Sequence, residues 1–203
     1  EILIDAGLFY GHREEFYEVN TRFSYPLQKV DALVLSHAHI DHCGNIPTLY
    51  KHGLRCKVYT TSATRDLCKL MLADSGRVQA EDYRYLAKIA RSTRGRRRPH
   101  HREPFNVRGP LYTEHEAVRS ITRFRPLHYG QRFQSTHDVQ VTFFDAGHIL
   151  GASVILFEGR LPGRTLRLGY AVDLGREDLP MLNNPTVLRD LDYLILESTY
   201  GGR

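Results

Sequence analysis

The sequence has few cysteines and no long apolar run, and both shortages limit what the protein can be. Its three cysteines, Cys43, Cys56 and Cys68, are an odd number without the spacing of a disulfide framework. They fit a reducing compartment, so we expect a cytoplasmic protein whose thiols are small, structural apolar side chains. No stretch of about 18 apolar residues occurs, so neither a membrane span nor a secretory signal is expected.

Charge of one sign is present in only small excess. The 203 residues carry a formal net charge of +5, which favours an anionic partner only weakly. Hydrophobic residues make up 41% of the chain, enough to form a core. The length suits one large domain, or one domain with a fragment of another. Because both ends lie next to strand-like segments, we expect a piece of a longer protein.

The most informative stretch is residues 33–42. Val and Leu predict a strand there, and it leads into His37, His39, Asp41 and His42. Side chains alternate along an extended segment, so His37 and His39 point the same way and can bind one metal ion. Asp41 and His42 follow where Gly, Asn and Pro turn the chain, and they can face a second ion. A solvated loop is the alternative, but it accounts poorly for four metal-binding groups in six residues.

Two later positions can complete a metal site. His148 lies in a glycine-flanked turn after the apolar run 139–144, and Asp173 follows the strand-like segment 166–171. Polar residues at the ends of apolar strands are often functional, because loops there are held by a rigid scaffold. By itself, each is more typical of an ordinary loop residue. Their significance comes from joining the first cluster.

The chain as a whole predicts an α/β protein. Strands are predicted at 2–4, 30–36, 57–60, 139–144, 153–157, 166–171 and 193–196. Helices are predicted at 45–52, 61–74, 82–92 and 114–123, and irregular surface chain at 8–29. Strands cluster at both ends and helices follow the histidine strand. This order predicts two packed mixed sheets with outer helices.

One basic segment, residues 92–110, differs in composition from the rest. An exposed loop is its usual explanation. The alternative is a contact with nucleic-acid phosphates through Arg94, Arg96, Arg97 and Arg98. His100 and His101 lie among these cations, which disfavours metal binding there.

Together these motifs resemble the metallo-β-lactamase superfamily. The resemblance is carried by Asp5-Ala-Gly7, His37-x-His39-x-Asp41-His42, Gly147-His148 and Asp173. Leu196-Glu-Ser-Thr-Tyr-Gly201 resembles the first acidic motif of the β-CASP branch, the nucleases of RNA processing and DNA repair. Within that branch the chain most resembles the RNA-cleaving members, such as the cleavage-and-polyadenylation endonuclease and ribonuclease J. The resemblance implies an incomplete αββα sandwich: residues 1–203 form the N-terminal part of the domain, and the following β-CASP domain is absent.

The resemblance also implies a site with two zinc ions. The implied ligands are His37, His39 and His148 for one Zn2+, Asp41 and His42 for the second, and Asp173 as a bridge between them. Asp5 is not a ligand in the family but orients the histidine motif from behind.

Asp41 and Glu197 are the predicted catalytic residues. In the family, Glu197 pairs with a later histidine that protonates the leaving group. That histidine is not among these residues, so we expect the chain alone to bind at least one zinc ion but to show little or no nuclease activity.

The implied activity is zinc-dependent hydrolysis of phosphodiester bonds in single-stranded RNA, of the mRNA 3′-end processing or RNA degradation type. One alternative is a thioesterase or lactonase with the same fold, which would not be expected to carry the motif at 197–201. Another is a non-catalytic β-CASP scaffold, which would be expected to have lost metal ligands. Endonuclease or exonuclease action, RNA or DNA preference, and assembly as a homo-oligomer or in a processing complex all stay open.

Overall fold

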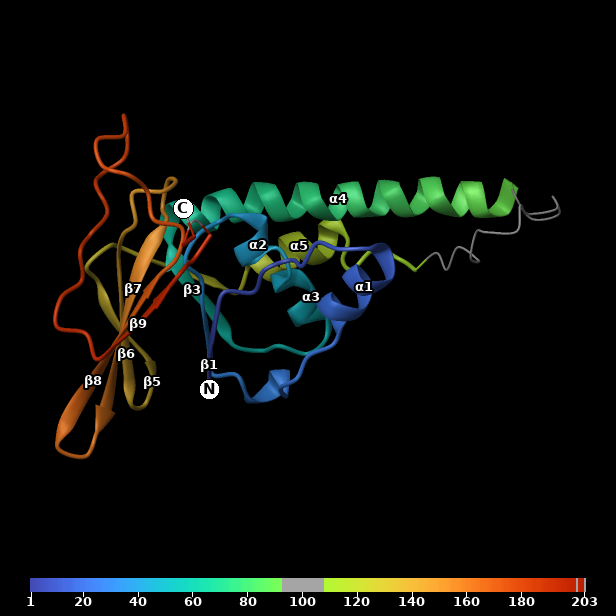
Figure 1. Cartoon of the computed structure of the whole chain (residues 1–203). Helices are drawn as coiled ribbons and strands as arrows, with labels where there is room; N and C mark the ends of the chain where they lie inside the picture. Colours follow the sequence, from blue (N-terminus) through green and yellow to red (C-terminus); the bar gives the residue numbers. More distant parts are fainter. Residues whose placement is uncertain (93–107, 200, 203) are drawn as a thin grey trace.

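Two β-sheets pack against each other, and the helices lie on the outer side of one of them (Figure 1). The computed structural model describes residues 1–92, 108–199 and 201–202. The first sheet has the strand order β1-β2-β3-β4, and every neighbouring pair is parallel. Its strands span Ile2–Ile4, Ala32–Val34, Lys57–Thr61 and Phe124–Leu127.

The second sheet has the order β5-β6-β7-β8-β9. Its strands span Arg132–Thr136, Val139–Asp145, Ser153–Leu161, Arg164–Ala171 and Tyr193–Leu196. All its pairs are antiparallel except β8 and β9. The prediction of two mixed sheets is therefore correct for this sheet and wrong for the first. Strands of the first sheet are joined by helical crossovers, and such connections leave neighbouring strands parallel.

Helices follow the strands of the first sheet. They are α1 (Arg13–Thr21), the 3-10 helix η1 (Leu27–Lys29), α2 (Ile40–Cys43), α3 (Ile46–Lys51), α4 (Ser62–Ser92) and α5 (Glu114–Ile121). Leu49 of α3 and Leu72 of α4 join Leu33 of β2 in one buried apolar cluster. Within the described residues, no helix combines the length and the apolar character needed to cross a membrane.

The outer side of the second sheet contacts irregular chain. The segment between β8 and β9 places Leu188 and Leu191 close to Gly169 of β8. Leu188 also packs against the buried cluster of Ala146, Ala152, Val154 and Ala171. The predicted fold class is confirmed in its incomplete form, with helices flanking the first sheet.

Helix α4 corrects one prediction. Two helices were expected at 61–74 and 82–92, but one helix runs through both segments. A Cβ on Gly76 would lie 2.7 Å from the backbone nitrogen of Glu114, so glycine there lets α4 approach α5 rather than ending the helix. Arg77 continues the helix with ion pairs to Asp74 and Glu81, three and four residues away.

Residues 8–29 correct another prediction, since this segment contains α1 and η1. The buried Asn20 holds it in place. Its side-chain oxygen accepts a hydrogen bond from the Phe9 nitrogen, and its amide donates to the carbonyls of Phe9 and Phe16. These hydrogen bonds leave no trace in the spacing of apolar residues, so the sequence pattern could not predict them.

Strands β4 and β5 were not predicted. β4 contains Pro126, which is tolerated because β4 is at the edge of its sheet. β5 has one large apolar side chain, Phe133, which stacks on Tyr59 at 4.6 Å between ring centroids. This contact joins the two sheets through an interior that also contains Val34 and Phe143.

Candidate metal centre

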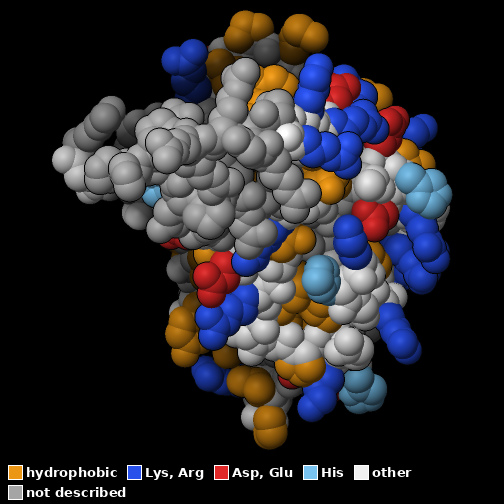
Figure 2. Space-filling view, turned by 90° about the vertical axis from the view of Figure 1, so that its right-hand side faces the viewer, with side chains coloured by type: hydrophobic (Ala, Val, Ile, Leu, Met, Phe, Trp, Pro, Cys, Tyr) orange, Lys and Arg blue, Asp and Glu red, His pale blue; other side chains and the backbone are white. Residues whose placement is uncertain are grey.

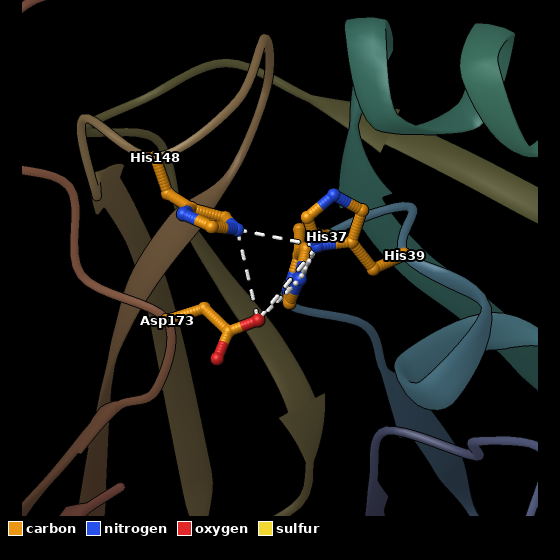
Figure 3. A group of neighbouring side chains, drawn as sticks. All are labelled: His37, His39, His148 and Asp173. Atoms are coloured by element: carbon orange, nitrogen blue, oxygen red, sulfur yellow. Dashed lines mark hydrogen bonds and ion pairs between the residues drawn. The ribbon is translucent and has the colours of Figure 1, made fainter. Parts of the chain in front are cut away.

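Four side chains from three separate segments meet between the two sheets (Figure 3). His37 and His39 follow β2, His148 lies between β6 and β7, and Asp173 follows β8. One nitrogen of each histidine and one oxygen of Asp173 all lie within 4.8 Å of one another. The chain is therefore folded so that predicted ligands 136 positions apart, from His37 to Asp173, share one small space.

The separations of these atoms suit a single metal ion. His37 Nε2 is 3.0 Å from Asp173 Oδ2 and 3.1 Å from His39 Nδ1. His148 Nε2 is 3.2 Å from His39 Nδ1 and 3.6 Å from Asp173 Oδ2. Ligands about 2.0–2.1 Å from a tetrahedral ion lie roughly 3.3 Å from one another. The side chains therefore form a set of donors that fits a metal ion.

His37 is held in the neutral form that metal ligation requires. It is only 1% exposed, and burial lowers its pKa to about 3, with a further contribution from the neighbouring His42. Its Nδ1 lies 3.0 Å from Ser36 Oγ. Because Nδ1 has this partner, Nε2 is the nitrogen directed to the cluster.

His42 and Asp41 border the same cluster. His42 Nε2 is 3.5 Å from Asp173 Oδ2 and 3.8 Å from Asp41 Oδ2. Asp41 has a 64% exposed side chain, the most open of the group. The Asp173 carboxylate thus faces His37 and His42 together, as a shared carboxylate would. The assignment of Asp41 and His42 to a second ion stays a prediction.

Asp5 lies behind the histidine motif, directly after β1. Its Oδ1 accepts a hydrogen bond from the Ser36 nitrogen at 2.7 Å, and its Oδ2 accepts one from Ser36 Oγ at 2.7 Å. His42 Nδ1 is 2.8 Å from the same Oδ2. Burial opposes protonation of His42, but Asp5, with smaller contributions from Asp173 and Asp41, outweighs burial and leaves the pKa of His42 raised. The Asp5 contact turns His42 Nε2 toward Asp173.

The turns that carry His148 and Asp173 pack backbone against backbone. A Cβ on Gly175 would lie 1.7 Å from the Gly147 carbonyl oxygen, so only glycine allows this approach. The Gly175 nitrogen donates to the Ala146 carbonyl at 2.9 Å. The close contact of Gly175 with Gly147 and the hydrogen bond from Gly175 to Ala146 together set the distance between His148 and Asp173.

The end of β3 and the start of α4 also hold the His148 turn. Thr61 Oγ1 and Thr64 Oγ1 both donate to the Gly151 carbonyl, at 2.7 and 2.9 Å. Both threonines are buried. Sequence reasoning did not identify these supporting residues, because their partner lies some 90 residues away along the chain.

Glu197 lies beside the centre, half-buried after β9. Its charge raises the pKa of His148, although burial is the larger influence and leaves that pKa lowered. Thr199 Oγ1 donates to the Glu197 carboxylate at 2.8 Å. The catalytic role of Glu197 stays a prediction.

Two other predictions concern the Cys43 thiol and the arginines of the basic segment. Cys43 is fully buried and its Sγ donates to the Ala38 carbonyl at 3.2 Å, as a structural thiol would. The predicted phosphate contacts lie outside the described residues; they are Arg94, Arg96, Arg97 and Arg98.

Comparison with known families gives one match over most of the chain. The metallo-beta-lactamase superfamily domain matches residues 1–188. Ribonuclease TTHA0252 of Thermus thermophilus is 29% identical over 202 residues, which are 100% of this chain and 39% of that protein. Transcription termination factor FttA of Methanocaldococcus jannaschii is 29% identical over 205 residues, covering 98% of this chain and 28% of the relative.

A third relative has a similar sequence identity to this chain. Endoribonuclease ysh1 of Emericella nidulans is 30% identical over 206 residues, covering 98% of this chain and 20% of that protein. These relatives belong to the β-CASP RNA-processing branch, so the predicted resemblance is confirmed. The chain spans between 20% and 39% of the lengths of these three relatives.

Proposed function

This chain belongs to the metallo-beta-lactamase superfamily, and from that membership we propose that it builds the metal centre of a zinc-dependent ribonuclease. The reaction is hydrolysis of phosphodiester bonds in RNA. The observation that carries the proposal is the convergence of His37, His39, His148 and Asp173 on one position. Relatives with the printed names ribonuclease and endoribonuclease, matched over nearly the whole chain, support RNA as the substrate.

Zinc is the proposed metal because of the donor set. Three imidazoles with one carboxylate suit zinc better than calcium or magnesium, which prefer oxygen ligands. A bound zinc ion would lower the pKa of a coordinated water to about 7 and stabilise negative charge on phosphoryl oxygens.

The chain's own residues position these parts. His37 stays neutral in its buried site, so its lone pair is available over the physiological pH range. Asp173 supplies the negative charge between the histidines of the two sheets. Asp41, the exposed member of the group, is open to water and substrate.

A basic face on α4 supports RNA binding. Arg84, Lys88 and Arg91 are four and three residues apart, so they lie on one side of the helix. All three are exposed, and none forms an ion pair with another described residue. Figure 1 shows α4 extending past the other helices, and Figure 2 shows Lys and Arg side chains spread over this end of the molecule. Exposed cations without an ion pair to any described residue can bind phosphates.

The basic face has its own test. Replacing Arg84, Lys88 and Arg91 together with Gln is expected to weaken RNA binding and to reduce the salt-dependence slope by about 2. Zinc content should not change. The matched control replaces three other exposed arginines with Gln: Arg55, Arg119 and Arg123. Equal loss of RNA affinity in both triple variants would argue against a specific α4 contact.

The activity is tested with the 203-residue chain and with the full-length product of its gene, both loaded with zinc. Labelled single-stranded RNA is assayed beside a thioester and a lactone, with Asp173→Asn as the inactive control. The full-length product should cleave RNA in a chelator-sensitive way, and Asp173→Asn should abolish cleavage. Hydrolysis of the thioester or lactone without RNA cleavage would overturn the proposal, as would a zinc-loaded full-length product that cleaves none of the three.

A further inference from the structure

Tyr170 connects the second sheet to the support of the histidine motif. It lies in β8, three residues before Asp173, and its hydroxyl is 2.9 Å from Asp5 Oδ2. Asp5 follows β1 of the first sheet. Because an ionised carboxylate only accepts, the tyrosine hydroxyl is the donor. The hydrogen bond therefore crosses from one sheet to the other directly behind the metal centre.

The acceptor oxygen is shared among three groups. Asp5 Oδ2 is 2.7 Å from Ser36 Oγ, 2.8 Å from His42 Nδ1 and 2.9 Å from Tyr170 Oη. His42 belongs to the histidine motif, Ser36 directly precedes it, and Tyr170 belongs to the second sheet. Burial and the charge of Asp5 raise the pKa of Tyr170, so the hydroxyl keeps its proton. Asp5 is thus the point at which the two sides of the site are joined.

Other contacts between the two sides act elsewhere. The Ser153 nitrogen donates to the Ser36 carbonyl at 3.0 Å, and Thr61 and Thr64 hold Gly151 in the His148 turn. Among the described residues, Tyr170 is the only side chain of the second sheet that bonds to Asp5. The short stretch from Tyr170 to Asp173 passes this constraint to the carboxylate of the metal centre.

We propose that Tyr170 is a positioning residue for metal binding, which fixes Asp173 and His42 at their mutual distance through its hydrogen bond to Asp5. Without the hydroxyl, this hydrogen bond no longer links the ligands of the two sheets, and Asp5 loses one of its donors. Supporting hydrogen bonds of metal sites are generally worth about 10- to 100-fold in affinity. This inference rests on the metal binding that the proposed function requires.

The test is Tyr170→Phe, which removes the hydroxyl and keeps the ring that packs against the core between the sheets. Zinc affinity is measured by competition with a chromophoric chelator, and the site geometry by the visible absorption of bound Co2+. We expect about 10- to 100-fold weaker zinc binding and an altered Co2+ spectrum. The control is Tyr112→Phe, which removes a buried hydroxyl that is bonded to Ser75 Oγ at 2.9 Å and not to Asp5 or a ligand of the metal centre.

A purely structural role would lower the stability of metal-free protein in both variants and leave both zinc affinities unchanged. The route through Asp5 is tested by a double-mutant cycle. In an Asp5→Asn background, Tyr170→Phe should cause little further loss of zinc affinity. An unchanged affinity and Co2+ spectrum in Tyr170→Phe would overturn the proposal, as would an equal loss in both backgrounds. Failure of the wild-type chain to bind zinc would instead overturn the proposed function, because no RNA cleavage enters these measurements.

Discussion

The two sides of the metal centre are built in different ways. On the side of the first sheet, His37, His39 and His42 come from one short stretch directly after β2, with Asp5 behind it. On the side of the second sheet, His148 and Asp173 come from two turns that contact each other through glycine backbone. The ligands of the first side are neighbours in the sequence, and Asp5 supports them from behind. The second exists only when distant segments pack correctly.

The largest effects are expected at one glycine on each side. A Cβ on Gly7 would lie 1.6 Å from the Asp41 carbonyl oxygen, and one on Gly175 would lie 1.7 Å from the Gly147 carbonyl oxygen. Gly7→Ala and Gly175→Ala should each lower the free energy of unfolding by about 2–4 kcal/mol, since the clash is with backbone. Urea denaturation of metal-free protein measures this.

These two variants should differ in metal binding. Gly175→Ala separates the turns of His148 and Asp173, so its zinc affinity should fall well beyond that of Gly7→Ala. Gly159→Ala is the control, because a Cβ there meets only the Leu166 carbonyl oxygen, at 4.0 Å. Equal zinc affinities in the Gly7 and Gly175 variants would remove the distinction between the two sides.

Asp173→Asn should have a large effect on metal binding and a small one on folding. The substitution keeps the size of the side chain but removes the charge shared by His37, His42 and His148. We expect at least about 100-fold weaker zinc binding, and a change in metal-free stability under about 1 kcal/mol, because the side chain is partly exposed. Isothermal titration and thermal unfolding with and without zinc report the two quantities. A stable variant that keeps wild-type zinc affinity would contradict the role of Asp173.

The smallest effect is expected far from both sides, at Glu116 of the α5 capping box. Burial opposes ionisation, but hydrogen bonds from Thr113 and the nearby Lys51 outweigh it and leave the pKa of Glu116 lowered. A lowered native-state pKa stabilises the fold above the unfolded-state pKa, and this contribution is lost as pH falls through the native pKa.

Glu116→Gln should therefore be less stable than wild type by under about 1 kcal/mol at pH 7. The difference should shrink as pH falls below the unfolded-state pKa of about 4.3 and disappear once pH has fallen through the lower native pKa. Urea denaturation over this pH range measures it, and zinc affinity should stay at the wild-type value. A stability difference that grows on acidification would show that the sign is wrong.

The difference between the two sides of the metal centre also explains which ligands the sequence could predict. His37, His39, Asp41 and His42 are close together in the chain, so strand alternation alone brings two of them to one side. His148 was recognised from its glycine turn and from family resemblance.

Supporting contacts could not be predicted from local pattern. Tyr170 meets Asp5 across 165 positions, and Gly175 meets Gly147 only in the folded protein. The one signal available for Tyr170 was its alternation with Leu168, which places both on the face toward the core.

The fold shows the same limits. Short segments rich in Val, Ile, Leu and Phe predicted β6 and β7, and alternating apolar side chains predicted β8. The continuity of α4 depends on how Gly76 fits against α5, and β4 contains a proline that argues against a strand. In both cases tertiary packing overrides a local preference.

The most direct test of a centre shared between the two sheets is the zinc content of purified wild-type protein, His39→Ala and His148→Ala. Each variant removes one histidine, from the first and the second side respectively. The wild type should retain about one or two zinc ions per chain, and both variants should lose zinc under the same dialysis. Retention of wild-type zinc by folded His148→Ala, with loss in His39→Ala, would show that the first side binds metal without the second and would contradict the account.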